Sequence, residues 1–292
     1  MNRASSQTHL KCQMSNPTSK VWMITGASRG FGAEIAAAAL ERGHRVVGTA
    51  RRVDSLPAPA GPEKYLRVAL DVTSREQAEN AVCSACESFG QIDVLVNNAG
   101  YGLLGSVEET SAEEIERLFQ TNVFGLLHVT RAVLPIFRKQ RSGHIINMSS
   151  VGGFSARPGW GPYSATKFAV EALTESLHAE LAPLGIHVTA VEPGSFRTDF
   201  LDTTSLVSTK NRIPDYDSTV GKMREFVVGR SGFQPGDPKK LAQAILQLAD
   251  LADPPVRLPL GTDTLRRIDE KQAFVKEETE RWRTLSASTD FV

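Results

Sequence analysis

Three side chains near the middle of the chain could move a proton to or from a substrate oxygen. Tyr163 and Lys167 stand four residues apart at the start of a stretch with helical periodicity, which places them one turn apart on one face. A free phenol titrates near ~10, and a nearby ammonium would lower the pKa of Tyr163 towards the working pH. Ser150, at the end of an apolar strand, could hold the substrate oxygen beside that phenol. The tyrosine–lysine spacing alone also fits ordinary packing, with a buried ring and a lysine that reaches solvent.

A glycine-rich turn is placed where a phosphate could bind. The apolar run Val21–Thr25 leads directly into Gly26, Gly30 and Gly32, and a helix follows. Glycines permit a tight turn there and let backbone N–H groups approach a pyrophosphate at the positive end of the helix. The spacing glycine-x3-glycine-x-glycine differs from the commoner dinucleotide pattern, so on its own the turn could also be a plain strand–helix connection.

The residues after the second predicted strand indicate which dinucleotide would bind. An acidic residue at that strand end would grip a ribose 2′-hydroxyl and exclude a 2′-phosphate. Here the strand leads into Arg51 and Arg52, and no carboxylate follows before Asp54. Arg29, inside the glycine turn, faces the same corner, and guanidinium forks match phosphate oxygens. The pattern therefore favours NADP(H), although one of the three arginines is expected to be an ordinary solvated side chain.

The composition points to a small-molecule partner. The chain has 292 residues, 41% of them hydrophobic, and 33 basic residues balance 33 acidic ones. A neutral chain lacks the electrostatic signature of nucleic-acid or anionic-membrane binding, and no apolar run approaches the length of a membrane helix. Three cysteines favour a reducing, cytoplasmic setting. Cys83 and Cys86 form a C-x-x-C pair inside a predicted helix, but no second ligand pair follows, so no metal site is predicted.

Alternating apolar runs and helical stretches predict a doubly wound, Rossmann-type α/β domain with helices on both faces of a parallel sheet. One domain is expected over residues 20–285, between a flexible tail at 1–19 and a C-terminal tail at 286–292. The expected strands are Val21–Thr25, Arg45–Ala50, Leu66–Leu70, Ile92–Val96, His144–Met148, Ile186–Val191 and Val256–Leu260. The expected helices include Phe31–Arg42, Glu76–Phe89, Ala112–Thr121, Val123–Lys139, Tyr163–Ala182 and Thr264–Arg283.

The segment Thr198–Gly236 breaks the alternating pattern. It is polar, long and weakly periodic, and it follows a predicted strand. A long ordered loop in this position is usually a lid or a specificity loop, so we expect it to cover the substrate; a disordered insertion is the alternative.

Taken together, these motifs resemble the short-chain dehydrogenase/reductase family in its compact, single-domain form. The likeness is strong from about Lys20 to Thr198 and looser over the last helices. It rests on the order of the motifs, each at a strand end or on an adjoining helix: Gly26–Gly32, Asn97-Asn98-Ala99-Gly100, Asn122, Ser150, Tyr163 with Lys167, and Pro193-Gly194.

The resemblance implies a role for each catalytic candidate. Tyr163 would donate the proton to a carbonyl during reduction or accept it during oxidation. Lys167 would hold the nicotinamide ribose and lower the pKa of the tyrosine, while Ser150 would orient the substrate oxygen. Asn122 matches the family asparagine that holds a water connecting the lysine to solvent. Hydride transfer between a nicotinamide and a carbonyl or secondary alcohol is the reaction implied.

The resemblance also implies the dinucleotide site. Asp71 and Val72 match the pair that contacts the adenine ring, and Asn98 the residue that supports the central strand and the adenosine ribose. Phe196 would act through its backbone and Thr198 through its hydroxyl, near the carboxamide and pyrophosphate. The full set expected to contact the cofactor is Gly26, Ser28, Arg29, Gly30, Phe31, Gly32, Arg51, Asp71, Val72, Asn98, Ala99, Gly100, Tyr163, Lys167, Pro193, Gly194, Phe196 and Thr198.

The substrate is expected to be a mainly apolar carbonyl or alcohol. Phe154 and Trp160 lie between the catalytic serine and tyrosine, although both could be packing residues; Arg157 could bind a substrate carboxylate, but a solvent-facing side chain is the favoured interpretation. The substrate pocket is expected to be lined by Tyr101–Leu104, Gly152–Trp160 and Thr198–Gly236.

Other functions on the same fold have to be weighed, because a fold alone does not establish chemistry. A catalytically silent NADP(H) sensor or scaffold would usually have lost the acid or its lysine, and both are present. A lyase relative is disfavoured by the retained glycine turn and Lys167, and a sugar epimerase by the different glycine pattern. The resemblance further implies a homodimer or homotetramer formed through the helices around Ala112–Lys139 and Tyr163–Ala182.

Overall fold

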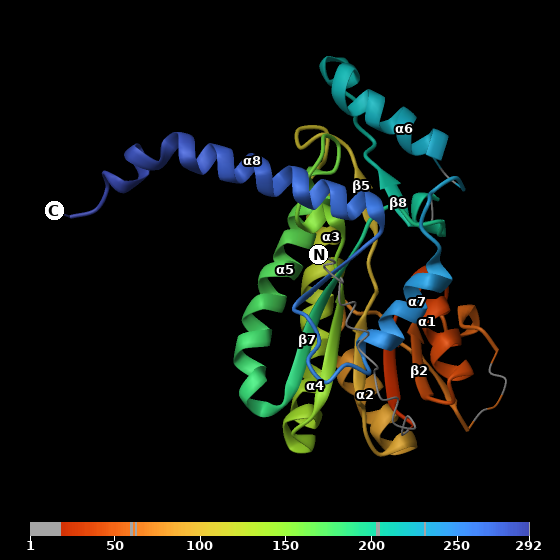
Figure 1. The fold of residues 1–292 in the computed structure, drawn as a ribbon. Helices are drawn as coiled ribbons and strands as arrows, with labels where there is room; N and C mark the ends of the chain where they lie inside the picture. The colour runs from red at the N-terminus through yellow and green to blue at the C-terminus, as the bar shows by residue number, and fades with distance from the viewer. Residues whose placement is uncertain (1–18, 59–60, 62, 203–204, 231, 292) are drawn as a thin grey trace, which may run out of the picture.

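Seven parallel strands form the centre of the molecule (Figure 1). The computed structural model describes residues 19–58, 61, 63–202, 205–230 and 232–291. The strands lie in the order β3-β2-β1-β4-β6-β7-β9, which confirms the predicted doubly wound sheet. Their bounds are β1 (Val21–Thr25), β2 (Arg45–Ala50), β3 (Tyr65–Ala69), β4 (Val94–Asn97), β6 (Gly143–Met148), β7 (Ile186–Pro193) and β9 (Arg257–Leu260).

Helices cover both faces of this sheet, as the sequence predicts. On one face α1 (Gly30–Glu41) and α7 (Pro238–Leu248) pack together over a core that contains Trp22, Ile35 and Ile245. The other face is covered by α2 (Arg75–Phe89), α4 (Leu126–Gln140) and α5 (Gly161–Leu181). The central strand β1 is a mainly apolar and fully buried run because both of its faces are covered.

The strand order reverses between β1 and β4, and this is where open α/β sheets bind ligands. β1 pairs with β2 in the register Val21↔Arg45 and with β4 in the register Trp22↔Val94. The carboxyl ends of β1, β4, β6 and β7 therefore meet at one edge of the sheet. The motifs singled out in the sequence follow these strand ends.

Two predicted helices turn out to be one continuous element. α3 (Ala112–Phe119) runs through a π-helical turn at Gln120–Gly125 into α4, whereas the sequence suggested a break at Asn122. Ser111 begins α3 with a capping box, in which its hydroxyl accepts from Glu114 N and the Glu114 carboxylate accepts from Ser111 N. Single π-turns inside helices often occur at functional sites, and here the turn carries Asn122.

The segment Thr198–Gly236 is an ordered substructure over its described residues, so the alternative of a disordered insertion is wrong for them. A parallel bridge between Phe196 and Gly236 joins its two ends, with Arg197 N donating to Gly236 O at 2.9 Å. Within it, β8 (Leu206–Ser208) pairs with β5 (Gly102–Leu104) in a small second sheet that periodicity did not predict. The helix α6 (Lys222–Arg230) lies above the end of the main sheet (Figure 1).

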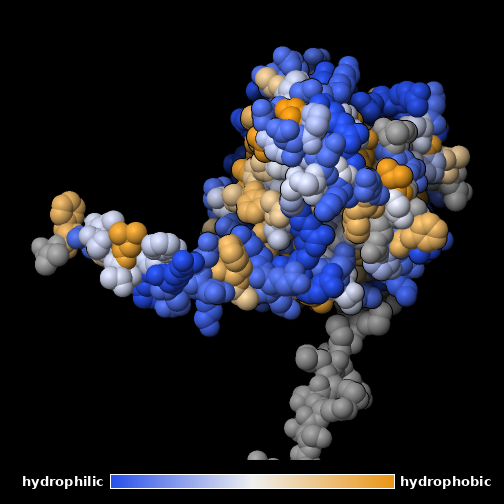
Figure 2. Space-filling model, turned by 90° about the horizontal axis from the view of Figure 1, so that it is seen from above, coloured by the Kyte–Doolittle hydropathy of each residue, from blue (hydrophilic) through white to orange (hydrophobic). Residues whose placement is uncertain are grey.

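The last helix, α8 (Thr262–Ala287), is longer than predicted at both ends and projects from the body of the molecule (Figure 1). The expected C-terminal tail at 286–292 is therefore helical at its start. Figure 2 shows that the projecting part is mainly hydrophilic, with scattered apolar side chains. The predicted N-terminal tail lies, except for Ser19, outside the described residues. Of the described helices, none is both long enough and apolar enough to cross a bilayer.

The buried histidine of β6 makes the stability of the fold depend on pH. His144 Nε2 lies 2.9 Å from Thr189 Oγ1, and burial, with smaller effects of His187 and Lys20, lowers the pKa of His144 from 6.5 to about 3. An unfolded histidine takes up a proton near ~6.5, so the free energy of unfolding falls as the pH drops from there towards 3. Between pH 7 and pH 5 this one group is expected to remove about 2 kcal/mol.

Urea denaturation of the wild type and of His144→Gln at the two pH values measures this contribution. The variant is expected to lose about 2 kcal/mol less than the wild type on acidification. His187→Gln is the matched control, because its ring packs edge-on against His144 at 5.8 Å but is partly exposed. Equal losses in the wild type and His144→Gln would rule out this histidine as the source.

Candidate active site

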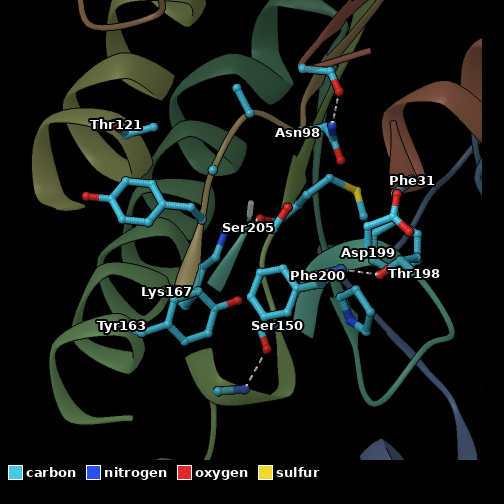
Figure 3. A pocket seen from close by; sticks show the side chains of 18 of the residues that line it. Phe31, Asn98, Thr121, Ser150, Tyr163, Lys167, Thr198, Asp199, Phe200 and Ser205 are labelled. Carbon is cyan, nitrogen blue, oxygen red and sulfur yellow. Dashed lines mark hydrogen bonds between the residues drawn. The ribbon is translucent and has the colours of Figure 1, made fainter. Parts of the chain in front are cut away.

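A single cavity of about 1430 Å³ runs along the carboxyl edge of the sheet. It extends from the glycine turn after β1, past the ends of β2 and β3, to the start of α5 and the segment Thr198–Gly236. Tyr163, Lys167 and Ser150 all line it, and Figure 3 shows the three side chains grouped together with Phe200 beside them. The structure thus brings the predicted acid–base residues into one site.

Tyr163 is held in an aromatic environment that covers its ring. Its side chain is only 7% exposed, and Trp160 and Phe200 pack against it with ring centroids 5.6 and 5.8 Å away. Burial raises the pKa of Tyr163 to about 12, and a side-chain hydrogen bond with Ser150 opposes this shift. The phenol therefore keeps its proton at neutral pH.

Burial raises the pKa of Tyr163 in this structure, whereas the nearby ammonium of Lys167 was expected to lower it. Its Nζ lies 5.8 Å from the centroid of the Tyr163 ring, and the desolvation of the phenol outweighs any effect of the ammonium. The ammonium donates to Met148 O at 2.8 Å. Burial lowers the pKa of Lys167 to about 8, and Glu171, one turn further along α5, raises it. Lys167 is thus a largely charged donor at neutral pH, held against the end of β6.

Ser150 and Asn122 occupy different positions relative to the cavity. The Ser150 Oγ accepts from Gly152 N at 3.0 Å, which orients the hydroxyl at the cavity wall (Figure 3). Asn122 lies behind the wall, where its amide donates to Tyr101 O and Thr166 Oγ1 and its Oδ1 accepts from Tyr101 N. It therefore fixes the loop after β4 against α5, close to Lys167.

The glycine turn has the shape that a pyrophosphate requires. Gly26 has a φ of +65°, and a Cβ at this position would lie 3.1 Å from Ala99 Cα. The Thr25 hydroxyl accepts from Asn98 N and Ala99 N at 2.9 and 3.0 Å, so the loops after β1 and β4 are joined directly. Because α1 begins at Gly30 on the cavity wall, its first N–H groups are available to an anion. The residues present therefore fit a bound dinucleotide.

The loop after β2 closes the other end of this groove with positive charge. Arg51, Arg52 and Ser55 line the cavity there, opposite Arg29 at the start of α1. Among the described residues that line the cavity directly after β2, none is acidic, and Asp54 is not among them. Ser55 was missed in the sequence because a single loop serine carries no distinguishing signal.

Most of the residues predicted to contact the cofactor line the cavity. The exception is Gly32, which packs behind the turn, since a Cβ there would lie 2.4 Å from Gly26 O. The predicted residues on the wall are Gly26, Ser28, Arg29, Gly30, Phe31, Arg51, Asp71, Val72, Asn98, Ala99, Gly100, Tyr163, Lys167, Pro193, Gly194, Phe196 and Thr198.

The substrate end differs in part from the expected lining. Of Tyr101–Leu104 only Tyr101 reaches the cavity, because the next three residues are buried in β5, which pairs with β8. Phe154 points away and lines a second cavity between α5 and α8. Sequence reasoning missed Arg267 of α8, which lines the cavity although it is more than one hundred residues from Ser150 and Tyr163 in the sequence.

Comparison with known proteins identifies the fold and the site together. A family model described as short chain dehydrogenase matches residues 20–206, which carry the glycine turn, Ser150, Tyr163 and Lys167. The chain belongs to the short-chain dehydrogenase family. It is accordingly an oxidoreductase of the kind that depends on a nicotinamide cofactor.

Relatives of this family match nearly the whole chain. An oxidoreductase of Botryotinia fuckeliana is 38% identical over 92% of this chain and 99% of its own length. A 3-ketodihydrosphingosine reductase of Bacteroides thetaiotaomicron is 37% identical over 83% of this chain and 88% of its own. The crystal structure of a short-chain dehydrogenase from Streptomyces avermitilis is 41% identical, has a TM-score of 0.88, and covers 94% of this chain and 100% of that one.

Solved relatives bind both forms of the cofactor. A short chain dehydrogenase from Burkholderia phymatum holds NAD; it is 26% identical, with a TM-score of 0.78 and coverage of 91% of this chain and 97% of that one. One from Burkholderia cenocepacia holds NADP; it is 27% identical, with a TM-score of 0.71 and coverage of 90% and 97%. These relatives therefore do not indicate whether this dehydrogenase uses NAD or NADP, which has to be argued from its own residues.

A buried ion pair attaches the segment Thr198–Gly236 of this dehydrogenase to the rest of the domain. The Glu109 carboxylate is completely buried before α3 and accepts from Arg224 of α6 at 2.7 Å. It also accepts from Ser106 N at 2.8 Å and Ile213 N at 2.9 Å. Burial opposes the charge of Glu109, but these hydrogen bonds and Arg224 outweigh it and lower the pKa to about 2. Glu109 is therefore ionised at neutral pH and contacts both ends of the stretch 213–224.

Glu109→Gln is expected to loosen the stretch 213–224 without unfolding the domain. The substitution leaves Arg224 without its carboxylate and replaces an acceptor oxygen by a donor, which should cost about 3 kcal/mol locally. Hydrogen exchange of amides in 206–227 should rise by roughly 100-fold, while that of β1 and β4 stays unchanged. Asp217→Asn is the control, because its ion pair with Arg212 lies on the surface of the same stretch and contributes little to stability. Equal exchange in both variants would show that Glu109 does not hold this stretch in place.

Proposed function

We propose that this protein is an NADP(H)-dependent reductase of carbonyl compounds, in which Tyr163 donates the proton to the carbonyl oxygen. The observation that carries the proposal is the environment of Tyr163. Its phenol is buried, protonated at neutral pH and hydrogen-bonded to Ser150 in a cavity that also holds Lys167. A pKa of about 12 leaves roughly one phenol in 10⁵ ionised at pH 7, so the group is a proton donor rather than a base.

Each catalytic candidate has one task in this scheme. The bound nicotinamide cofactor supplies the hydride. Ser150 donates a hydrogen bond to the substrate oxygen and holds it next to the phenol, which stabilises the charge that develops there. Tyr163 then transfers its proton to that oxygen. Lys167 provides a positive charge one helix turn away that favours the resulting phenolate. Asn122 keeps the loop at Tyr101 in place beside Lys167.

The preference for NADP(H) is supported by charge at the end of β2. Arg29 and Arg51 flank the part of the cavity where a ribose 2′-phosphate would lie, and the described residues put no carboxylate there. A reductase that draws on NADPH is consistent with a phenol that keeps its proton.

An apolar substrate body is supported by the wall beyond Tyr163. Trp160, Leu201, Met223, Phe226 and Val227 line the cavity on that side. The relative from Bacteroides thetaiotaomicron is named for the reduction of a ketone on a sphingoid base, a molecule with a long apolar chain. For this protein we propose only the substrate class, which is ketones with a substantial apolar part.

The test is consumption of NADPH against a panel of ketones, quinones, steroids and retinals. Turnover of at least one apolar ketone, faster with NADPH than with NADH, is expected. A protein that binds NADPH tightly and oxidises it with no member of the panel would instead be a sensor or scaffold on this fold.

We further propose that the enzyme is a homodimer or homotetramer that works in the cytoplasm. Phe124 and Phe168 support the first part, because each is almost half exposed on the helices through which the family assembles. Cys83 and Cys86 support the second, since both are free thiols on α2. Sedimentation equilibrium of the wild type and of Phe124→Ser/Phe168→Ser tests the assembly.

A further inference from the structure

Two arginines line the cavity near the loop between Ser150 and Tyr163. Arg157 lies in the loop between Ser150 and Tyr163, and Arg267 lies in α8. Both line the cavity together with Trp160 and Met223. The proposed reduction uses neither of them, so their presence requires a separate explanation.

Arg267 is held next to the catalytic residues by the start of α8. Asp263 accepts from Ser195 N at 2.9 Å, which ties the first turn of the helix to the segment after β7. One turn later the Arg267 guanidinium donates to Ser155 O, in the loop that follows Ser150. Arg267 therefore bridges the loop after the catalytic serine and the segment 193–195, and Arg157 lies two residues beyond the point of contact.

The two guanidiniums are close enough to repel one another. Burial and then the charge of Arg157 lower the pKa of Arg267 to about 10, against the opposing influence of Asp263 and Glu270. The ion pairs formed between described residues include neither arginine. Arg157 is exposed, as the sequence analysis favoured, and Arg267 is half-buried, but both line the cavity. Two neighbouring guanidiniums at a cavity wall, neither in an ion pair, suit an anionic ligand.

We propose that the substrates of this site are amphipathic oxo acids, whose carboxylate binds between Arg157 and Arg267. The inference rests on the proposed carbonyl reduction and adds the class of substrate. The ketone would reach Ser150 and Tyr163, while the apolar chain packs against Trp160, Met223 and Phe226. The carboxylate would also relieve the repulsion between the two arginines, so binding of the acid is favoured over that of a neutral ketone.

The experiment compares medium-chain oxo acids, with the ketone at different distances from the carboxylate, with their methyl esters. The wild type is expected to reduce the best acid with a kcat/KM at least tenfold above that of its ester. In Arg157→Met/Arg267→Met, the acid should lose roughly 10- to 100-fold and the ester less than threefold. The kcat/KM of Arg267→Lys for the acid should lie between those of the wild type and the double variant. A lysine ammonium keeps the positive charge but loses the paired N–H donors of the guanidinium.

A purely structural role of Arg267 gives a different result. Loss of its hydrogen bond to Ser155 O would displace the catalytic loop and slow the acid and the ester equally, which would overturn the proposal. So would a substrate preference for a phosphate monoester of the same chain over the carboxylate, because the site would then bind a different anion.

Calorimetry separates failure of this inference from failure of the proposed reduction. The hydroxy acids corresponding to the best-binding chain lengths should bind the wild type with its dinucleotide at least tenfold more tightly than they bind the double variant. If no ketone is reduced but this difference is found, the reduction fails and the anion site stands. If ketones are reduced and the difference is missing, the anion site fails alone.

Discussion

Replacement of Tyr163 by phenylalanine is expected to reduce kcat by roughly 10³-fold or more. The reaction needs a proton at the substrate oxygen, and the phenol is the buried donor that contacts Ser150 at the cavity wall. Phenylalanine keeps the ring that packs against Trp160 and Phe200, so the fold and the wall of the cavity should persist. Steady-state reduction of the best ketone, together with fluorescence titration of NADPH, measures both effects. The dissociation constant for NADPH should change less than threefold.

Ser164→Ala is the matched control for this loss of a hydroxyl. Ser164 is the next residue on α5, lines the same cavity and is as well buried, and its hydroxyl has no role in the proposed proton transfer. Its activity should stay within about threefold of the wild type, because loss of a single hydroxyl outside the reaction usually costs little. Activity of Tyr163→Phe close to that of Ser164→Ala would exclude the tyrosine as the proton donor.

The doubly wound sheet and the grouping of the candidate catalytic residues could be predicted because both depend on local patterns. Short apolar runs separated by helical stretches define the parallel strands, and the motifs follow the strand ends at which such sheets bind ligands. Tyr163 and Lys167 lie on one helix, and residues four apart on a helix are neighbours on the same face, so their proximity follows from the sequence. Ser150 joins them because β6 and α5 are consecutive in the chain and pack together.

What the sequence did not reveal depends on contacts between distant segments. β5 and β8 are each three residues long, and their pairing joins Gly102 to Leu206 across the chain, too short a pattern for periodicity to detect. Arg267 reaches the cavity only because Asp263 holds the start of α8 at Ser195. The pKa of Tyr163 was expected to fall, but burial raises it, and the rings of Trp160 and Phe200 pack against the tyrosine ring. Spacing on a helix cannot show such burial.

The double substitution Arg29→Ala/Arg51→Ala is expected to reverse the choice of cofactor. Charge-assisted hydrogen bonds to a phosphate contribute about 1.5–3 kcal/mol each, so the loss of two guanidiniums should cost at least about 3 kcal/mol in binding of the 2′-phosphate. The ratio of kcat/KM for NADPH to that for NADH should therefore fall by roughly 100-fold. NADH has a 2′-hydroxyl at that position, so its kcat/KM should change less than about threefold. Steady-state kinetics with one ketone and both cofactors gives the ratio.

The control and the salt dependence decide whether the effect comes from these two side chains or from general positive charge. Arg67 of β3 is exposed near the same edge of the sheet but does not line the cavity, so Arg67→Ala should leave the ratio unchanged. A general loss of positive charge would act at long range and would be screened by salt. Arg67→Ala would then lower the ratio as well, and both effects would vanish at high ionic strength.

Direct contacts with the 2′-phosphate predict instead that only the double variant loses its preference for NADPH, and that this loss persists at high ionic strength. An unchanged ratio in the double variant would contradict the proposed preference for NADP(H), because no other described cation except Arg52 lines that corner of the cavity.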